Sequence, residues 1–289
     1  MPVVLRLLAA SNLTYEADPA GSNSSYADLA QLQNRVNFAR GIDRINSALV
    51  GTADFGVVVA FRGTLPPVGS PDPLQTIRDW VQDLECELDA GAKIPGLVHH
   101  GFLGALDSLW ADLEPEVTAQ LQASPVKKLY VTGHSKGGAM CHIAAARFAM
   151  MSIISGNSIV VRSFEGAMPG DDDFATSYAR LVPDAIRFEY QDDAVPHLPP
   201  SVAGRELLRG LPGFENVLAL ADDYLYAHAG VLSFADWSNT LVPDSQMLRL
   251  QRNFKLGQQL VTGHVKEVIQ DHSIGDASGL WAVIQAAGL

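Results

Sequence analysis

The sequence predicts an α/β fold, with a mostly parallel central sheet and helices on both faces. Three observations carry this prediction. From about residue 101 to residue 190, short apolar runs of strand length alternate with longer segments whose apolar residues recur every three or four positions. Residues 57–61 are apolar throughout, which is typical of a strand buried on both faces. A glycine-rich turn also separates a strand pattern from a helix pattern near residue 135.

Each expected element follows from its local pattern. Residues 3–10 form a packed helix or strand, and a turn at 51–54 joins strands at 42–50 and 54–61. A helix is expected over 101–122, because Phe102, Leu106 and Leu109 begin an apolar stripe at helical spacing. The remaining expected elements are strands 128–132, 159–164 and 185–190 and helices 137–151 and 174–181. Residues 201–265 show a mixed pattern and receive no assignment.

Composition narrows the class of protein. The 289 residues are 47% hydrophobic and 18% charged, which supports one large core and a single domain over 1–289. Lys and Arg number 20 against 32 Asp and Glu, giving a formal net charge of −12. Because a phosphate backbone requires a basic surface, nucleic acid is not an expected partner.

Signals for export, membranes and metals are weak. No apolar run reaches the roughly 18 residues that a membrane-spanning helix needs. The apolar segment at the N-terminus is short, and Arg6 interrupts it, whereas the apolar region of a signal peptide is continuous. We therefore expect a soluble protein that is cytoplasmic or non-classically exported. Cys86 and Cys141 cannot form a disulfide framework, and no Cys and His residues have zinc-site spacing.

The turn near residue 135 carries the chemistry. Residues 133–138 read Gly-His-Ser-Lys-Gly-Gly directly after a strand pattern and before a helix pattern, which is the G-x-S-x-G nucleophile elbow of α/β-hydrolases. The turn lifts the Ser135 hydroxyl clear of the sheet, and the amide of Lys136 becomes a donor to an oxyanion. The alternative is a glycine-rich turn with an incidental serine. A phosphate-binding loop is excluded by the glycine and lysine spacing.

A serine nucleophile requires a histidine base and a carboxylate that orients it. In α/β-hydrolases the acid follows the serine in the chain and precedes the histidine. Asp192 and Asp193 directly follow the strand expected at 185–190, and the residues alone leave both open. Of the later histidines His197, His228, His264 and His272, the last has the position of a base carried on a loop before the final helix.

Together these residues resemble the class 3, or fungal-type, lipase family of α/β-hydrolases, over about residues 54–272. Asp193 stands three positions before the first proline of its loop, as the family's acid does, and this selects it over Asp192. The segments that carry the resemblance are Phe61-Arg62-Gly63-Thr64, Asp79-Trp80 with Asp83, Val98 to Phe102, Gly133 to Gly138, Asp193 to Pro200 and Asp271-His272.

The resemblance implies further roles. Thr64 contributes its amide and hydroxyl to the oxyanion hole opposite the Lys136 amide, and Asp83 holds the Thr64 hydroxyl. Residues 65–84 form a lid in which Trp80 meets lipid, unless they are a surface loop that never moves. No metal or organic cofactor is needed.

Some features depart from the family pattern. Lys136 replaces a hydrophobic residue, which places a cation near the mouth of the site and can change the pH optimum. The segment 164–171 lacks the family's arginine and spacing. The triad chemistry is unaffected by either departure.

The expected activity is carboxylic ester hydrolysis, and the expected substrate is an acylglycerol met at a lipid–water interface. Alternatives with the same chemistry are an esterase for soluble or feruloyl-type esters and a phospholipase A1. The net negative charge weakens adsorption to anionic membranes and so favours neutral lipid. An alternative of another class is a lipase-like binding domain without turnover. It is disfavoured because serine, acid and histidine are all present.

Several other polar residues have simpler interpretations than ligand binding. The acidic run 171–173 is a solvated loop in preference to a calcium site. Of His99 and His100 we expect one to be buried and hydrogen-bonded and the other exposed. His134 lines or supports the pocket. The aromatic stretch 222–237 belongs to the core in preference to an acyl site.

Overall fold

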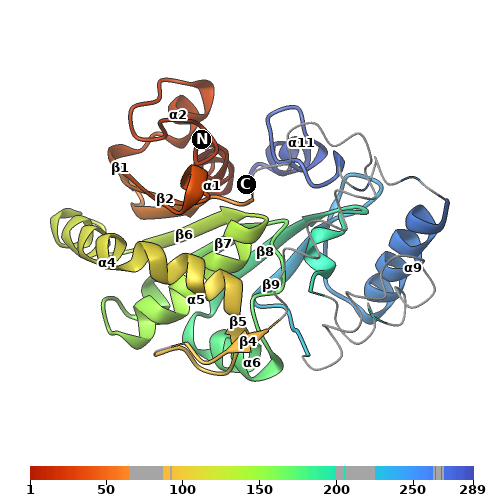
Figure 1. Ribbon diagram of the computed structural model, residues 1–289. Helices are drawn as coiled ribbons and strands as arrows, with labels where there is room; N and C mark the ends of the chain where they lie inside the picture. The colour runs from red at the N-terminus through yellow and green to blue at the C-terminus, as the bar shows by residue number, and fades with distance from the viewer. Residues whose placement is uncertain are drawn as a thin grey trace.

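A computed structural model describes residues 1–64, 87–91, 93–199, 225–262 and 270–289, together with Arg205, His264 and Val268. Its main feature is an eight-stranded sheet in the order β1-β2-β3-β6-β7-β8-β9-β10 (Figure 1). The five strands from β3 to β9 in this order run parallel, whereas β1, β2 and β10 pair antiparallel with their neighbours. This arrangement confirms the expected α/β class with a mostly parallel sheet.

The strands have the following bounds: β1 Gln33–Arg40, β2 Asn46–Ala53, β3 Gly56–Phe61, β6 Leu129–His134, β7 Ile159–Phe164, β8 Asp184–Tyr190, β9 Val231–Ala235 and β10 Leu241–Pro243. A separate small sheet pairs β4 Leu88–Asp89 with β5 Val98–His99. Short 3-10 turns occupy Ile42–Arg44, Gly156–Ser158 and Val195–His197.

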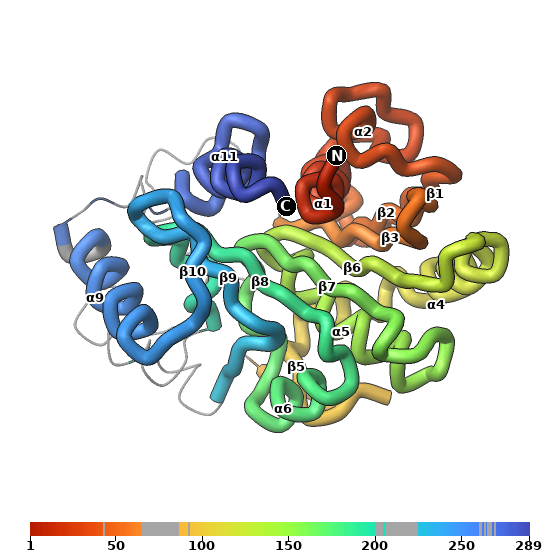
Figure 2. Tube along the Cα trace, turned by 180° about the vertical axis from the view of Figure 1, so that it is seen from behind, coloured from red at the N-terminus to blue at the C-terminus, as the bar shows by residue number. Residues whose placement is uncertain are grey.

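Helices cover both faces of the sheet. On one face lie α1 (Val3–Leu13), α2 (Ser25–Ala30) and α11 (Gly279–Ala286), and on the other lie α4 (His100–Ala123), α5 (Lys136–Met150) and α6 (Asp172–Leu181) (Figure 1). Helix α9 (Gln246–Thr262) lies at the end of the sheet beside β10 (Figure 2). The two termini meet, because the Leu5 amide donates a hydrogen bond of 3.1 Å to the Leu289 carbonyl.

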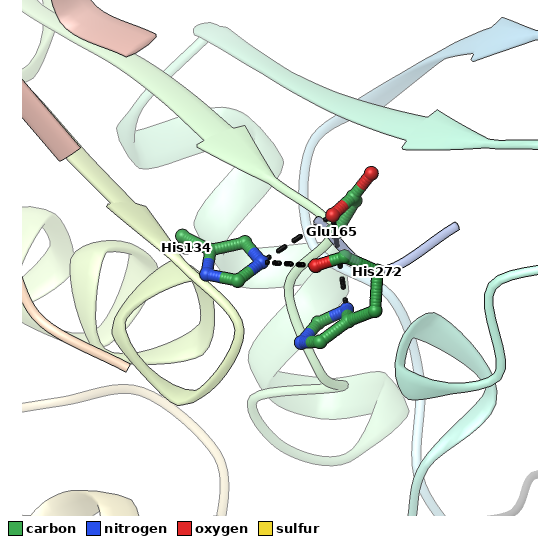
Figure 3. Close-up of side chains that lie close together, drawn as sticks. All are labelled: His134, Glu165 and His272. Atoms are coloured by element: carbon green, nitrogen blue, oxygen red, sulfur yellow. Dashed lines mark hydrogen bonds and ion pairs between the residues drawn. The ribbon is translucent and has the colours of Figure 1, made fainter. Parts of the chain in front are cut away.

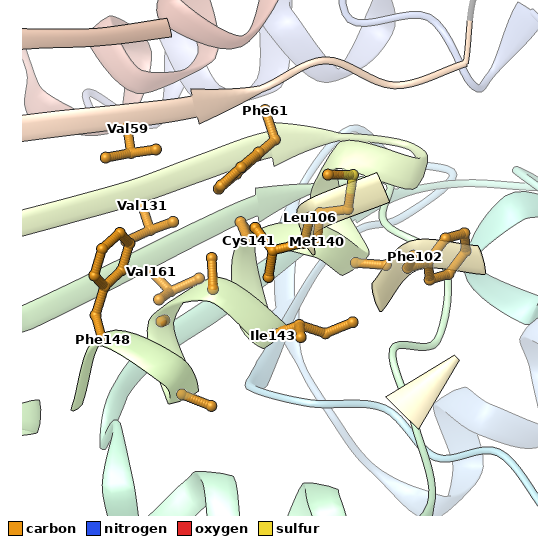
Figure 4. Packing of buried hydrophobic residues seen from close by; sticks show 14 of the residues in the cluster. Val59, Phe61, Phe102, Leu106, Val131, Met140, Cys141, Ile143, Phe148 and Val161 are labelled. Atoms are coloured by element: carbon orange, nitrogen blue, oxygen red, sulfur yellow. The ribbon is translucent and has the colours of Figure 1, made fainter. Parts of the chain in front are cut away.

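The core has two layers because alternate side chains of the central strands point to opposite faces. In β3, Val57, Val59 and Phe61 pack toward α4 and α5, whereas Val58 and Ala60 pack toward α1. Figure 4 shows Val59 and Phe61 of β3 in the same cluster as Met140 and Cys141 of α5. Every residue of β3 and β6 is buried, and in β3 this agrees with the continuous apolar run over residues 57–61. This rigid centre supports the carboxyl ends of the parallel strands.

Several expected elements have different bounds in the structure. Residues 42–44 form a 3-10 turn instead of the start of a strand, and the turn expected at 51–54 lies at Asp54 and Phe55. Strand β1 was not expected, because its side chains are partly exposed and it lacks a clean polar–apolar alternation. Strands β9 and β10 and helix α9 fall in the stretch 201–265 that received no assignment.

Candidate active site

The carboxyl ends of four neighbouring parallel strands meet at one edge of the sheet. Strand β3 leads into Thr64, β6 into Ser135, β7 into Glu165 and β8 into Asp193. The register holds these ends level, because Phe61 pairs with Gly133, His134 with Phe164, and Phe164 with Phe188. Residues that are far apart in the sequence therefore gather at a single edge, where parallel sheets carry their sites.

Ser135 lies in a strained turn between β6 and α5. Its φ of 59° and ψ of −128° lie in a region that residues with a side chain rarely adopt. The turn is tight because a Cβ at Gly133 would lie 2.2 Å from the Gly137 carbonyl oxygen, and one at Gly137 would lie 2.2 Å from the Phe61 carbonyl oxygen. Both positions therefore require glycine. Helix α5 begins at Lys136, so its N-terminal dipole favours negative charge beside Ser135.

His272 and Asp193 are in direct contact. The Nδ1 atom of His272 lies 2.9 Å from Oδ2 of Asp193, and Oδ1 of Asp193 accepts a hydrogen bond of 2.9 Å from the Val195 amide. Burial lowers the pKa of His272 to about 3, so its imidazole is neutral and can accept a proton. The neighbouring Asp192 has other partners, accepting hydrogen bonds from Trp237 and Gln259.

A pocket of about 790 Å³ opens at this edge of the sheet. Ser135, His272, Thr64 and Lys136 line it, so the structure brings four of the sequence-predicted site residues to one cavity. Its walls include the apolar side chains of Phe102, Ala105, Val195, Leu198 and Ile274. A pocket with convergent polar groups and apolar walls suits a substrate that has a polar reacting centre and an apolar body.

Lys136 places an amine near the same pocket. Its Nζ donates a hydrogen bond of 3.1 Å to Oδ1 of Asn46, which also lines the pocket. Burial, together with the nearby Arg62 guanidinium, lowers the pKa of Lys136 to about 8. The charge of this amine therefore changes within an accessible pH range.

His134 supports the site from behind. Its Nε2 lies 2.9 Å from the backbone carbonyl oxygen of His272. Since a carbonyl only accepts, this nitrogen carries the proton, and Nδ1 accepts a hydrogen bond of 2.6 Å from the Tyr15 hydroxyl. Burial holds the pKa of His134 well below its usual value, which keeps the ring neutral. Tyr15 was missed in the sequence because its contact spans more than a hundred residues.

Glu165 is a second residue that sequence reasoning missed. Its side chain is fully buried, and Oε2 lies 3.3 Å from Nε2 of His134 and 3.8 Å from Nδ1 of His272 (Figure 3). The available signal was its position: an acid directly after a buried strand whose neighbours carry Ser135 and Asp193.

The three side chains in Figure 3 have the composition of a metal site, with one donor atom from each lying within 4.8 Å of the others. Two of the donors are committed elsewhere. The Nε2 proton of His134 points to the His272 carbonyl, and Nδ1 of His272 faces Asp193. We therefore assign this cluster to hydrogen bonding and not to metal binding.

The other histidines lie in structural positions. His99 is buried and its Nδ1 accepts a hydrogen bond from the Phe102 amide at the start of α4, whereas His100 is exposed, as expected. His228 lies 3.9 Å from Glu189, His197 lies 3.4 Å from Arg252, and His264 is exposed beside Thr262. None of these three is among the described residues that line the pocket.

Two further expectations cannot be placed. Trp80 and Asp83, and the whole of the expected lid at 65–84, lie outside the described residues. Thr64, the last described residue before them, is half-buried and lines the pocket.

The sheet order, the strained Ser135 turn and the buried His272–Asp193 pair define the α/β-hydrolase class. A family model described as Lipase (class 3) matches residues 58–203, and the chain belongs to this family. The matched residues include Thr64, Ser135 and Asp193. His272 lies beyond them, although the resemblance in the sequence was expected to extend to that residue.

Individual relatives agree with the family assignment. The chain is 31% identical over 153 residues to "Secreted mono- and diacylglycerol lipase 1" of Fusarium solani, covering 51% of this chain and 40% of that protein. It is 27% identical over 194 residues to a "Lipase" of Rhizopus niveus, covering 66% of this chain and 46% of the relative. The matches thus span less than half the length of these two relatives.

Solved structures show the same fold. The triacylglyceride lipase of Rhizomucor miehei superposes with a TM-score of 0.63 at 22% identity, covering 80% of this chain and 78% of that chain. Lipase II from Rhizopus niveus superposes with a TM-score of 0.60 at 19% identity, with the same two coverages. Among the described helices, none has the length and apolar character needed to cross a bilayer.

Proposed function

We propose that this chain is a serine-dependent carboxylic ester hydrolase that acts on acylglycerols. One observation carries the proposal: Ser135, held in the strained turn at the end of β6, shares a pocket with His272, whose Nδ1 lies 2.9 Å from Asp193. This is the set of nucleophile, base and orienting acid that acyl transfer requires.

In this proposal each group has one role. His272 takes the proton of Ser135 as the hydroxyl attacks the ester carbonyl, and it then protonates the leaving alcohol. Asp193 fixes the tautomer of His272 and stabilises the imidazolium. The amides of Thr64 and Lys136 bind the oxyanion, where one donor can contribute about 3–4 kcal/mol in the transition state. Water, activated by His272, then hydrolyses the acyl-enzyme.

The choice of acylglycerol substrates rests on the pocket and the relatives. Phe102, Val195 and Leu198 give the pocket apolar walls suited to an acyl chain. The relatives are named as mono- and diacylglycerol or triacylglycerol lipases. We extend this substrate class to the chain, with Asp83 holding the Thr64 hydroxyl and Trp80 meeting lipid in the lid, as the family resemblance implies.

Hydrolysis of p-nitrophenyl esters from acetate to palmitate, followed by triacylglycerol emulsions, tests this proposal. Ser135→Ala is expected to lower kcat by a factor on the order of 10⁶, the cost of removing a triad serine. Ser273→Ala is the matched control, because Ser273 lines the same pocket and the proposed mechanism gives it no role. It should retain activity within a few-fold of the unmodified protein.

The outcomes separate the alternatives. A preference for long acyl chains and emulsions supports a lipase, whereas activity confined to short or aromatic esters identifies an esterase. Equal rates for the unmodified protein and Ser135→Ala would refute the hydrolase proposal and leave a lipase-like binding domain.

The relatives also bear on location. One of them is named as secreted, and this favours export over a cytoplasmic site. We propose that the ester hydrolase acts outside the cell that makes it. Assaying esterase activity in the culture medium against washed cells tests this, and activity confined to the cells would contradict it.

A further inference from the structure

Two carboxyl groups, not one, face the imidazole of His272. Oδ2 of Asp193 lies 2.9 Å from Nδ1, and Oε2 of Glu165 lies 3.8 Å from the same atom. They reach it from different strands, since Asp193 follows β8 and Glu165 follows β7. The Glu165 backbone is fixed in place by a hydrogen bond of 2.7 Å from its amide to the Phe188 carbonyl.

Glu165 is an unusual buried acid. Its side chain has no exposed surface, and neither carboxyl oxygen makes a hydrogen bond to the described residues. Glu189, an equally buried acid nearby, is paired with both Arg187 and Arg252. A buried carboxyl without a hydrogen bond lowers the stability of the folded protein. Its place beside the catalytic base points instead to a function.

The two acids differ in their hydrogen bonds. Asp193 is bonded by the Val195 amide and by His272 Nδ1, both of which favour a carboxylate. Burial, with the neighbouring charges of Asp193, Asp271 and Glu189, holds the pKa of Glu165 well above its usual value. Burial also raises the pKa of Asp193. When two acids share one site only one carries the charge, and the two donors at Asp193, against no hydrogen bond to Glu165 from the described residues, favour the charge on Asp193. Glu165 is therefore the protonated member.

We propose that Glu165 is a second acid of the catalytic histidine, which can accept the hydrogen bond from the Nδ1–H group of His272 when Asp193 is absent. This inference rests on the proposed function, in which His272 is the base. In the resting protein Glu165 is neutral. When Asp193 is removed, Glu165 loses its proton to solvent, its carboxylate moves about 1 Å toward Nδ1, and it orients His272 through a charge-assisted hydrogen bond.

The groups that face Glu165 set its pKa, and so set the pH above which its carboxylate can take the place of Asp193. They are His134 on β6, Glu189 and Asp193 on and after β8, and Asp271 and His272 on the loop before α11. The hydroxyls of Tyr15 and Tyr190 also interact with it. Removal of Asp193 takes away the neighbouring acid with the largest effect, so the pKa of Glu165 falls. Burial and the remaining acids still keep it above that of an exposed glutamate.

A double-mutant cycle of kcat/KM on a p-nitrophenyl ester tests the proposal. Loss of a triad acid alone typically costs a factor on the order of 10⁴ in kcat. Because Glu165 can take the place of Asp193, Asp193→Ala is expected to lower kcat/KM by only about 10–100-fold. The double variant Asp193→Ala with Glu165→Gln should lower it by the full factor of about 10⁴. In the unmodified background Glu165→Gln should change the rate by less than about fivefold.

Two readouts separate this role from a structural one. In Asp193→Ala the rate should rise with pH as Glu165 ionises, and this limb should vanish in the double variant. The downfield proton signal of the His272 Nδ1–H group should persist in Asp193→Ala and vanish in the double variant, whether or not either variant turns over. Asp192→Ala is the matched control, because Asp192 is the adjacent acid and bonds Trp237 and Gln259 instead.

The outcomes are decisive. The proposal would be overturned if Glu165→Gln lowered kcat/KM by the same factor in three backgrounds: Asp193→Ala, Asp192→Ala and the unmodified protein. So would a downfield signal unchanged by Glu165→Gln in the Asp193→Ala background. Ser135→Ala marks the activity floor. If Ser135→Ala turns over as fast as the unmodified protein, the proposed function has failed. If the rates lie above that floor and Glu165→Gln lowers them by the same factor in all three backgrounds, only the role proposed for Glu165 is refuted.

Discussion

Single residues decide the chemistry of this site, and burial changes the protonation of several of them. His272 and His134 are neutral because they are removed from water, and Lys136 is close to losing its proton. The local sequence around Ser135 was enough to predict the tight turn that carries this serine, because the turn is built from six consecutive residues. Glu165 and Tyr15 could not be predicted, because their contacts with His134 and His272 form only when distant segments pack.

Lys136 should give the proposed hydrolase a charge-dependent substrate preference. Its pKa of about 8 means that the amine is charged below pH 8 and neutral above it. KM for the anionic ester p-nitrophenyl hemisuccinate should therefore rise by up to about fivefold between pH 7 and pH 9, since a partly screened charge pair contributes about 0.2–1 kcal/mol.

Lys136→Met should give the high KM at both pH values, and p-nitrophenyl butyrate is the neutral control that should show no such change. A KM for hemisuccinate that stays constant with pH in the unmodified protein would show that the amine does not reach the substrate.

Helices and strands position the site through their ends. The level carboxyl ends of β3, β6, β7 and β8 could be anticipated from the alternation of strand and helix patterns. Asp193 and Asp192 could not be separated by that pattern, because both directly follow β8 and only the register of the turn decides which one faces His272. Strand β1 was not anticipated, since its half-exposed residues lack both a buried run and a regular alternation.

The start of α6 provides a test at this scale. Oδ1 of Asp171 accepts hydrogen bonds from the Phe174 amide at 2.7 Å and the Leu97 amide at 3.1 Å. The acidic run 171–173 therefore includes a helix N-cap. Asp171→Ala should lower the free energy of unfolding by about 1–2 kcal/mol, the usual cost of a lost cap.

Urea unfolding measures this change. Asp173→Ala is the matched control, because Asp173 is exposed in the first turn and acts only through the helix dipole, which contributes about 0.3–1 kcal/mol. Equal losses in the two variants would contradict the assignment of the cap.

Across the whole molecule, buried histidines link stability to pH. His142 lies in the core between Tyr178 and Ser163, with ring nitrogens 2.9 Å and 3.0 Å from their hydroxyls. Burial lowers the pKa of His142 to about 3 from a usual value of 6.5. Between pH 6.5 and pH 3 the unfolded chain therefore binds a proton that the folded protein does not, so stability falls as pH falls through this range.

His142→Gln removes this contribution. The slope of unfolding free energy against pH, measured by urea unfolding between pH 4 and pH 6, should decrease by up to about 1.4 kcal/mol per pH unit. His264→Gln is the control, because His264 is exposed. An unchanged slope in His142→Gln would show that this histidine is protonated in the folded state.

The central claim is that Ser135 is a nucleophile activated by His272 and Asp193, and covalent titration tests it most directly. A p-nitrophenyl phosphonate should release one p-nitrophenol per chain, and mass spectrometry should find the phosphonyl group on the peptide that contains Ser135. Ser135→Ala should release none, whereas Ser273→Ala should titrate fully. Labelling at another residue, or equal release from Ser135→Ala, would contradict the account.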